Sequence, residues 1–498
     1  MKNLHPITSF LVVALALTFL SSCENQKRNS RQLAKRHCSS CHLFPDPSLL
    51  DKKTWKYGVL PEMAFRMGLD ISKLPGTNAQ ELNEILKVIP SEPLLSEEDW
   101  KSIKEYYINT APDIVYFSRE NKSLPLHQFT ASPITLPING KNMLTMIRAD
   151  HANNKIFIGT HQRKLFQLTN TLTLEDSFQL ISPPSDILFS MTENPIFSCM
   201  GIMDPNDQRA GSVRQLSTLK SSSQLLIDSI KRPVNIQQAD MNNDDQQDLI
   251  VSAFGNFTGA LYAYEKSGDE YRQHIIHNFP GTRQTIIRDF NEDALPDILA
   301  LITQGDEQIA LFTNRGNFRF SYQVLLKFPP VYGSSYFELC DFNRDGHPDI
   351  LYTNGDNADY SVILKPYHGV RIFLNDGKNH FAQSWFFPMH GASMARAADF
   401  DEDGDMDIAA ISFFPDFNKH PEHSFIYFEN DQRNFTPHIT ALAASSRWIT
   451  MELADIDDDR DLDLILGSLT FPNGVPDSLF QVWKKREASL LILKNNLR

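Results

Sequence analysis

Apolar residues follow three different patterns along the chain of 498 residues. Residues 10–20 form a mostly apolar stretch, about half as long as the ~20 residues that a helix needs to cross a bilayer. In "NAQELNEILKVI", which starts at Asn78, apolar residues recur at helical spacing. After residue 135, short apolar runs alternate with turn residues, a pattern typical of strands joined by tight turns. The pattern predicts a small helical domain followed by a larger all-β domain.

The first 23 residues have the three-part form of a secretory signal, with Lys2 before the apolar stretch and small residues after it. The ending "LSSC" resembles the lipobox of bacterial lipoproteins, in which the cysteine, here Cys23, becomes the acylated first residue. An ordinary signal peptide with an incidental cysteine is the alternative. The resemblance implies an exported lipoprotein that its lipid holds to a membrane, and Glu24 favours the outer membrane.

Three of the five cysteines lie within the first forty-one positions. Cys38, Cys41 and His42 form a C-x-x-C-H motif, the pattern of c-type haem attachment. In that chemistry the two thiols bond covalently to the haem, and the histidine is the proximal ligand of the iron. A thioredoxin-like motif would need a surrounding βαβ pattern, and a zinc site would need a second ligand pair; neither is visible. The motif predicts haem c.

The sixth iron ligand must come from elsewhere. Residues 43–125 contain no histidine, and their two methionines are Met63 and Met67. Met63, in an expected loop after Pro61, is the first choice; Met67 is the alternative, and would share a helix face with Met63 if this stretch were helical. The attachment helix, the methionine segment and a last helix starting at Ser96 resemble a class I cytochrome c over residues 24–113. The spacing between His42 and Met63 is short for that family.

Five acidic segments repeat one pattern, with oxygen-bearing side chains at relative positions 1, 3, 5 and 9 and then an apolar strand. Their first aspartates are 49, 52, 58 and 56 residues apart, which indicates a repeat architecture. Loops one to five, in chain order, are formed by Asp240, Asn242, Asp244 and Asp248; Asp289, Asn291, Asp293 and Asp297; Asp341, Asn343, Asp345 and Asp349; Asp399, Asp401, Asp403 and Asp407; and Asp455, Asp457, Asp459 and Asp463.

The spacing of these oxygens predicts up to five Ca²⁺ sites. Positions 1, 3 and 5 match the start of an EF-hand loop, and hard oxygen ligands select Ca²⁺ over transition metals. Five calcium ions would change the formal net charge from −14 to −4. Solvated acidic turns are the alternative. Gly346 and Gly404 stand at position 6, where a left-handed backbone favours glycine, so the third and fourth sites are expected to be the firmest.

The acidic repeats resemble FG-GAP/VCBS repeats, known from integrin-type propellers, over residues 232–498. Two weaker units precede them, one beginning "IRADHANNKIFIG" and one beginning "DILFSMTENPIF". Two weak and five intact units predict a seven-bladed β-propeller over residues 135–498, after a linker at residues 114–134. The expected fold is therefore a small all-α cytochrome c domain followed by an all-β seven-bladed propeller.

The expected function is electron transfer by a membrane-anchored c-type cytochrome. Its partner would be a periplasmic or cell-surface redox protein, recognised with the help of the propeller. The negative charge argues against nucleic acid as a partner. A sugar- or alcohol-oxidising dehydrogenase that reduces its own haem and an adhesive surface module are the alternatives.

No nucleophile–base pair stands out in the sequence, so no catalytic residue is assigned. Polar and aromatic insertions lengthen the last three blades, and they either form a rim site or only cover strand edges. Cys199 and Cys340 either form a disulfide or remain buried thiols. The residues that would test a rim site are Asp356, Asp359, Tyr360, Lys365 and His368.

Overall fold

The protein is described by a computed structural model that divides into two compact units. The first comprises residues up to 75 together with 89–115, and the second comprises residues 76–88 together with 116–498. Among the described residues, no helix is long and apolar enough to cross a membrane. Cys23 lies outside the described residues, which are 29–71, 78–116, 122–139, 142–190, 193–217, 223–355, 361 and 363–497.

The first unit is helical. Residues 29–38 form a helix that ends at Cys38. The rings of Trp55 and Tyr107 lie 4.5 Å apart in the core of this unit, and the Trp55 indole N–H donates to the Pro47 carbonyl at 2.9 Å. The other elements are a 3₁₀ turn (Pro47–Leu49), α2 (Lys52–Thr54), a π-helical turn (Trp55–Val59), α3 (Leu60–Arg66) and α5 (Glu97–Thr110).

The predicted start of the last helix of this unit is confirmed. The Ser96 hydroxyl accepts the backbone N–H of Asp99 at 3.1 Å, which satisfies one of the N–H groups that a helix start leaves unpaired. Helix α5 buries Trp100, Ile103 and Tyr107 on one face, as the spacing of its apolar residues predicts.

Helix α4 (Ala79–Leu86) belongs to the second unit, although it lies within residues 24–113, which were expected to form the small helical domain. Glu84 on this helix pairs with the Lys231 ammonium at 2.6 Å, and the Glu81 carboxylate accepts the backbone N–H of Asp207 at 3.0 Å. The hydrogen bond from Lys231 lowers the pKa of Glu84 to about 2. Two acidic side chains of α4 therefore fix it to the β-domain.

The second unit contains seven antiparallel sheets, so the predicted seven-bladed propeller is confirmed. The two weak repeats form complete four-stranded blades without an acidic loop. Blade one consists of β3 (Leu144–Asp150), β4 (Lys155–Thr160), β5 (Lys164–Thr169) and β6 (Leu174–Gln179), and blade two of β7 (Pro184–Leu188), β8 (Ile196–Cys199), β9 (Gly211–Leu216) and β10 (Ser223–Ile230).

Blades three to five follow with the same strand order, and their second strands are wholly buried. Blade three consists of β11 (Pro233–Ala239), β12 (Asp248–Ala253), β13 (Ala260–Ser267) and β14 (Glu270–His277). Blade four consists of β15 (Thr282–Arg288), β16 (Asp297–Ile302), β17 (Gln308–Asn314) and β18 (Phe320–Lys327). Blade five consists of β19 (Ser334–Cys340), β20 (Asp349–Asn354), β21 (Gly369–Asn375) and β22 (Phe381–Pro388).

Blades six and seven both contain a strand from the segment that was expected to be a linker. Blade six consists of β23 (Ala392–Ala398), β24 (Asp407–Ser412), β25 (Phe425–Asp431) and β26 (Asn434–Ile439), with the short β1 (Leu124–Pro125) parallel to β26. Blade seven consists of β27 (Trp448–Ala454), β28 (Asp463–Ser468), β29 (Leu490–Asn495) and β2 (Phe129–Ile134), and α6 (Asp477–Arg486) lies between β28 and β29 in the sequence.

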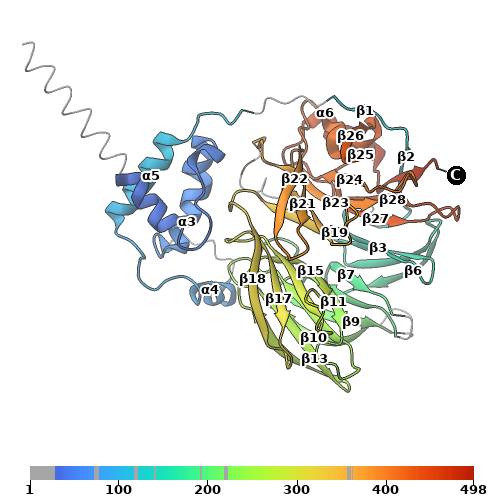
Figure 1. Cartoon of the computed structure of the whole chain (residues 1–498), viewed down its shortest axis with the longest axis horizontal. Coiled ribbons are helices and arrows are strands. Elements are labelled where there is room, and N and C mark those ends of the chain that lie inside the picture. Colours follow the sequence, from blue (N-terminus) through green and yellow to red (C-terminus); the bar gives the residue numbers. More distant parts are fainter. Residues whose placement is uncertain are drawn as a thin grey trace, which may run out of the picture. The chain divides into compact units, whose positions relative to one another are not determined.

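Strand β2 closes the ring. It pairs antiparallel with β29 along its whole length, from Phe129 opposite Asn495 to Ile134 opposite Leu490. Strand β27 of the same blade packs beside β3 of blade one (Figure 1). The propeller therefore begins before the expected residue 135, because its last blade needs a strand from the N-terminal side.

Charged side chains connect the innermost strands of neighbouring blades. Arg148 pairs with Asp186 at 3.0 Å and with Glu452 at 3.3 Å. Arg396 pairs with Glu338 at 3.0 Å and with Glu452 at 3.8 Å. The four carboxylate contacts hold these half-buried guanidinium groups between blades one, two, five, six and seven. Charges that are partly removed from water need a partner, so the network opposes any loosening of one blade from the next.

Candidate functional site

The C-x-x-C-H motif lies at the end of the first helix. Cys38 is its last residue, and Cys41 and His42 lie in the turn that follows. Both cysteines are free thiols, and burial raises the pKa of Cys38 to about 11. His42 Nδ1 lies 2.9 Å from the Leu43 carbonyl, which can only accept, so Nδ1 carries the proton and Nε2 the lone pair. Two thiols and an oriented imidazole within one turn fit the covalent attachment of haem.

The two methionines lie on helix α3 and at its end, so the loop expected around Met63 is a helix. The backbone N–H of Met67 donates to the Met63 carbonyl at 3.1 Å, which places the two residues one turn apart. Both side chains are half-buried. Residues four apart share a helix face, so Met63 and Met67 remain alternative ligands.

The aspartate at position 9 of each acidic loop is fully buried at the start of the second strand of its blade. One of its oxygens accepts the N–H of position 2, and the other accepts an N–H of the third strand. In loop three, Asp349 accepts from Phe342 at 2.9 Å and from Asn375 at 2.8 Å. Burial raises the pKa of Asp407 to about 7 and that of Asp463 to about 6. Position 9 therefore anchors its loop to the blade.

The backbone at position 6 is left-handed in all five loops, as the glycines in loops three and four predict. Its N–H donates to the aspartate at position 1 at 2.8–3.0 Å in every loop. Three loops adopt this conformation without glycine, which is strained for residues with a Cβ. The φ angles are +65° at Asp245, +67° at Ala294, +85° at Gly346, +95° at Gly404 and +75° at Arg460.

Position 3 separates loops one to three from loops four and five. In loops one to three it is an asparagine whose amide donates to the carboxylate at position 5, at 3.1, 3.0 and 2.9 Å. In loops four and five it is Asp401 and Asp457, and ionised carboxylates have no proton to donate. In loops one to three, the carboxylate at position 5 therefore has a hydrogen-bond donor within its own loop, whereas position 3 supplies no such donor in loops four and five.

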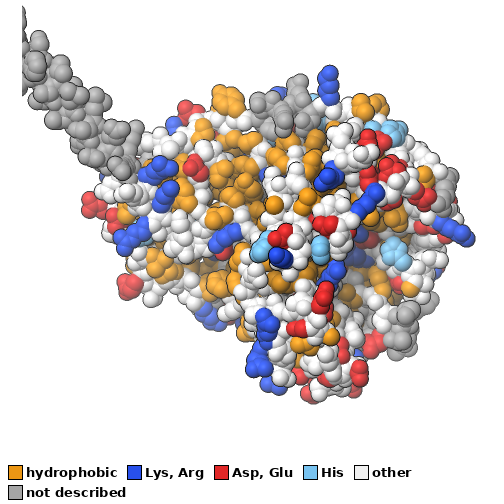
Figure 2. Space-filling model, in the orientation of Figure 1, with side chains coloured by type: hydrophobic (Ala, Val, Ile, Leu, Met, Phe, Trp, Pro, Cys, Tyr) orange, Lys and Arg blue, Asp and Glu red, His pale blue; other side chains and the backbone are white. Residues whose placement is uncertain are grey.

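Carboxylates gather most closely in loops four and five. One oxygen each of Asp399, Asp401 and Asp403 lies within 4.8 Å of the others, and the same holds for Asp455, Asp457 and Asp463. Figure 2 shows acidic side chains over the part of the propeller where Figure 1 labels β2 and β28. Like charges at such distances repel unless a cation lies among them. Glycine at position 6 makes loops three and four the better candidates for a cation site, whereas the clustering of carboxylates favours loops four and five.

Two buried oxygens in loop four point to a missing positive partner. Oδ1 of Asp399 and Oδ1 of Asp405 are buried and accept no hydrogen bond. A buried oxygen of this kind is costly unless a cation or a donor satisfies it. In loop five, the Lys494 ammonium pairs with Asp457 and offsets part of the negative charge of the loop. The donor set of these loops fits a hard divalent cation such as Ca²⁺.

The residues expected at a rim site are only partly described. Asp356, Asp359 and Tyr360 lie outside the described residues. Lys365 and His368 are buried inside the insertion of blade five, and burial lowers the pKa of His368. These two side chains lie in the interior of the insertion rather than on an exposed rim.

A pocket of about 490 Å³ opens beside this insertion. The rings of Tyr332 and Tyr367 stack at 4.9 Å in its wall, and the Arg371 guanidinium lies 4.0 Å from the centre of the Phe386 ring. The pocket offers an aromatic surface to a ligand, and two cationic residues, Lys327 and Arg371, are part of its lining.

Cys199 and Cys340 are not joined by a disulfide. Cys199 is fully buried in the core of blades one and two, and Cys340 is half-buried. Burial raises the pKa of Cys199 to about 11 and that of Cys340 to about 12. At neutral pH both are unreactive thiols.

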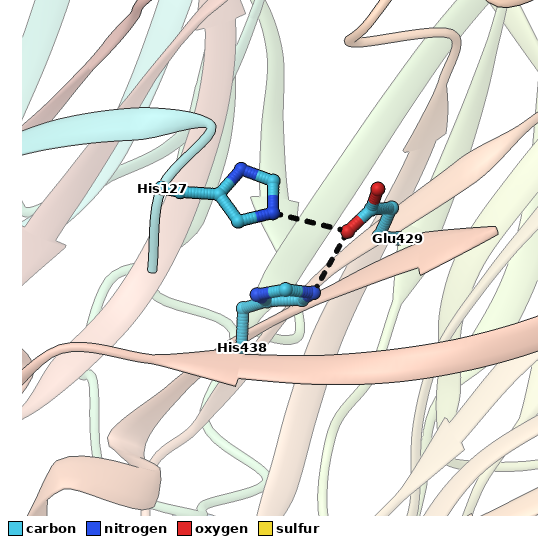
Figure 3. A group of neighbouring side chains, drawn as sticks. All are labelled: His127, Glu429 and His438. Carbon is cyan, nitrogen blue, oxygen red and sulfur yellow. Dashed lines mark hydrogen bonds and ion pairs between the residues drawn. The ribbon is translucent and has the colours of Figure 1, made fainter. Parts of the chain in front are cut away.

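His127, Glu429 and His438 form a group that no sequence motif predicts (Figure 3). His127 lies between β1 and β2, Glu429 on β25 and His438 on β26. Both imidazole rings face the same Glu429 oxygen, with Nε2 of His127 at 3.2 Å and Nε2 of His438 at 2.9 Å. Two of these residues are 302 positions apart, so no local motif could reveal the group.

Comparison with known families bears on the propeller. A family model described as "FG-GAP-like repeat" matches residues 289–352 and 353–410, which contain loops two, three and four. The chain therefore contains FG-GAP-like repeats in a seven-bladed β-propeller, an architecture that suggests a binding or recognition module. No curated protein sequence gives a significant match.

Several solved propellers are similar to the chain at low identity. The Pan2 WD40 domain of Neurospora crassa is 11% identical, with a TM-score of 0.46, over 76% of this chain and 98% of that domain. Sqt1 of Saccharomyces cerevisiae is 9% identical, with a TM-score of 0.44, over 73% of this chain and 98% of that chain. The Dos1 propeller is 10% identical, with a TM-score of 0.42, over 71% of this chain and 80% of that one.

Proposed function

We propose that the protein is a lipid-anchored c-type cytochrome that exchanges electrons with a periplasmic or cell-surface redox protein, and that its calcium-binding propeller recognises that partner. The observation that carries the proposal is the C-x-x-C-H turn, with two free thiols and with His42 Nδ1 hydrogen-bonded to the Leu43 carbonyl. The same hydrogen bond orients metal-bound histidines in many proteins and raises their basicity.

The helical unit would supply the surroundings of the haem. Haem c, when attached, provides a one-electron carrier. Cys38 and Cys41 would hold it, and His42 would present Nε2 to the iron. The packed core around Trp55 and Tyr107 fixes the segment from Phe44 to Pro47, since the Tyr107 hydroxyl donates to the Pro45 carbonyl at 3.0 Å. This contact steadies the chain directly after His42.

The propeller would supply recognition. Its acidic loops lie on the connection between the first two strands of five successive blades, and the orphaned carboxylate oxygens of loop four support Ca²⁺ there. Bound calcium would remove the repulsion within these loops and hold their shape. The aromatic pocket near Arg371 is the recessed surface that we propose for contact with a partner or ligand.

Membrane anchoring is the third part of the proposal. The lipobox-like "LSSC" supports acylation of Cys23, which would tether the mature chain to the outer membrane of a bacterium. Mass spectrometry of the membrane-extracted protein tests this part. We expect a lipid-modified N-terminal peptide that begins at Cys23, and a peptide that begins at an unmodified residue would contradict it.

The haem is tested by expressing the full chain together with a cytochrome c maturation system. We expect c-type absorption bands and a pyridine haemochrome that stays with the polypeptide after denaturation. Cys38→Ser combined with Cys41→Ser should abolish covalent haem, whereas the matched control of Cys199→Ser with Cys340→Ser should retain it. A wild-type chain without covalent haem would sink the proposal.

The sixth ligand is tested in the same material. Met63→Ala and Met67→Ala are compared for the charge-transfer band of methionine-ligated ferric haem. Loss of the band in one variant alone identifies the ligand. Loss only in the double variant shows that either methionine can bind, and retention in the double variant shows that neither binds the iron.

A further inference from the structure

The cluster of His127, Glu429 and His438 cannot be explained as an ordinary set of hydrogen bonds. Nδ1 of His438 lies 3.2 Å from the carbonyl oxygen of Pro125, which can only accept, so Nδ1 carries the proton. In the neutral ring, Nε2 then holds a lone pair. That nitrogen is buried, has no hydrogen-bond partner and lies 2.9 Å from a Glu429 oxygen. Two acceptors face each other at this distance, and something positive must lie between them.

A second imidazole approaches the same oxygen. Nε2 of His127 lies 3.2 Å from Oε2 of Glu429, and the two histidine rings meet edge to face with centres 4.6 Å apart. As a neutral tautomer, His127 can donate its Nε2–H to this oxygen, so the alternative to a metal ion is one extra proton, on Nε2 of His438. That proton would lack hydrogen-bond geometry toward Glu429, because Nε2 of His438 has no hydrogen-bond partner. One metal ion would satisfy all three groups together.

We propose that His127, Glu429 and His438 bind a divalent transition-metal ion of the zinc class. Two imidazole nitrogens and one carboxylate oxygen form a donor set suited to Zn²⁺ and its neighbours rather than to Ca²⁺. Ligands about 2.0–2.1 Å from a tetrahedral zinc ion lie roughly 3.3 Å from one another. The observed separations of 2.9 and 3.2 Å approach that value.

The exposure of the three residues defines the rest of the coordination shell. The His438 side chain is 1% exposed, those of Glu429 and His127 are 36% and 58% exposed, and the group therefore opens to solvent on one side. Water or a ligand from a partner would take the open position. The hydrogen bond from His438 to Pro125 is the outer contact that metal-bound histidines usually make.

The position of the site gives the ion a structural role. His127 belongs to the segment that leads from β1 on blade six to β2 in blade seven, and the other two ligands lie on β25 and β26 of blade six (Figure 3). A bound ion would therefore fasten the incoming segment to blade six directly before β2 closes the ring. Zinc is expected to stabilise the closed propeller, independently of calcium and of haem.

The test uses the full chain without an affinity tag, in excess Ca²⁺ so that the acidic loops are occupied. Zinc binding is measured by calorimetry and by elemental analysis after dialysis. We expect His127→Ala, His438→Ala and Glu429→Gln each to bind one zinc ion fewer per chain, or to bind it more than about tenfold more weakly. Equal zinc binding by the parent and by all three variants would overturn the proposal.

Matched controls separate a metal site from a structural contact. His274 forms a cross-strand pair with Glu265 at 2.8 Å, so His274→Ala removes a similar pair and should leave zinc binding unchanged. His127 is largely exposed, so His127→Ala should fold with an unchanged circular dichroism spectrum. Added zinc should raise the Tm of the parent but not that of His127→Ala. An equal rise in both proteins would also contradict the proposal.

Discussion

Blades three to five and blades six and seven contain the same acidic loop, but the two groups of loops are balanced differently. In the first group, the asparagine at position 3 donates a hydrogen bond to the carboxylate at position 5. In the second group an aspartate replaces it, and three carboxylates converge within 4.8 Å. One side chain of the nine thus distinguishes a loop with an internal amide donor from a loop without one.

The ring closure lies in the same two blades as the loops that lack the asparagine donor. Blades six and seven hold loops four and five, the closing strand β2 and the histidine cluster. Blades three to five each join consecutive strands of one continuous chain segment, whereas blade seven pairs β2, at residues 129–134, with strands of residues 448–495. Metal ions are therefore proposed where the chain has the least covalent continuity.

Removal of calcium should give the largest difference between the two groups. We expect chelation to lower the Tm and to speed hydrogen exchange at residues 399–407 and 455–463 more than in loops one to three. When the free calcium concentration is a hundred times the Kd of a site, binding at that site adds about 2.7 kcal/mol to the free energy of unfolding. If chelation sped up hydrogen exchange equally in all five loops, or in none of them, the two groups of loops would not differ in their need for calcium.

Substitution of the residue at position 3 should convert one kind of loop into the other. Asp401→Asn is expected to stabilise the calcium-free protein by about 1 kcal/mol and to weaken calcium binding in loop four, because it restores an amide donor. Asn343→Asp should do the reverse in loop three. Chemical unfolding with and without calcium measures both effects.

The matched control for these exchanges is Asp269→Asn, at an exposed residue in the turn between β13 and β14. It removes the same charge without touching a loop, so it should change neither stability nor calcium affinity. If it reproduced the Asp401→Asn result, net charge rather than loop geometry would be the cause.

Substitution at position 6 should change stability by a similar amount, but without changing calcium binding and in either group of loops. Ala294→Gly relieves a left-handed alanine at φ +67° and should stabilise the protein by about 1 kcal/mol. Gly404→Ala, at φ +95°, should destabilise it by a similar amount through strain alone, since the nearest atom to the new Cβ is 3.8 Å away. Thermal unfolding measures both effects, and a lower Tm for Ala294→Gly or a higher Tm for Gly404→Ala would refute the strain argument.

The smallest expected effect is that of Lys494 in loop five. Its side chain is 47% exposed, so solvent screens its pair with Asp457 and the pair contributes little to stability. Lys494→Met should slightly destabilise the calcium-free protein and tighten calcium binding in loop five, because a competing cation is lost. Calcium titration of the variant against the parent checks this, and weaker binding would show that the lysine assists the site.

The sequence could predict features that are encoded within a few consecutive residues. The acidic loops span nine positions each, and the repeat that they define along the chain predicts the seven blades of the structure. The helix start at Ser96 is equally local. These features depend on backbone geometry over one turn or one hairpin, which neighbouring residues set by themselves.

Contacts between distant segments could not be predicted in the same way. The amphipathic pattern of α4 indicates a helix but not that Glu84 pairs with Lys231 of the β-domain. The segment from Phe129 to Ile134 looked like a linker because its partner strand, β29, is at the far end of the chain. Its pairing depends on ring closure, a property of the whole propeller.

By itself, the sequence determined the repeat, the number of blades, the acidic loops and the thiol–imidazole motif, since each is written in residues that are close along the chain. Only the tertiary structure decided which loops lack an internal donor, which strand closes the ring, and that His127 meets Glu429 and His438. The physical reason is that side chains hundreds of residues apart become neighbours only after the sheets have packed around their common centre.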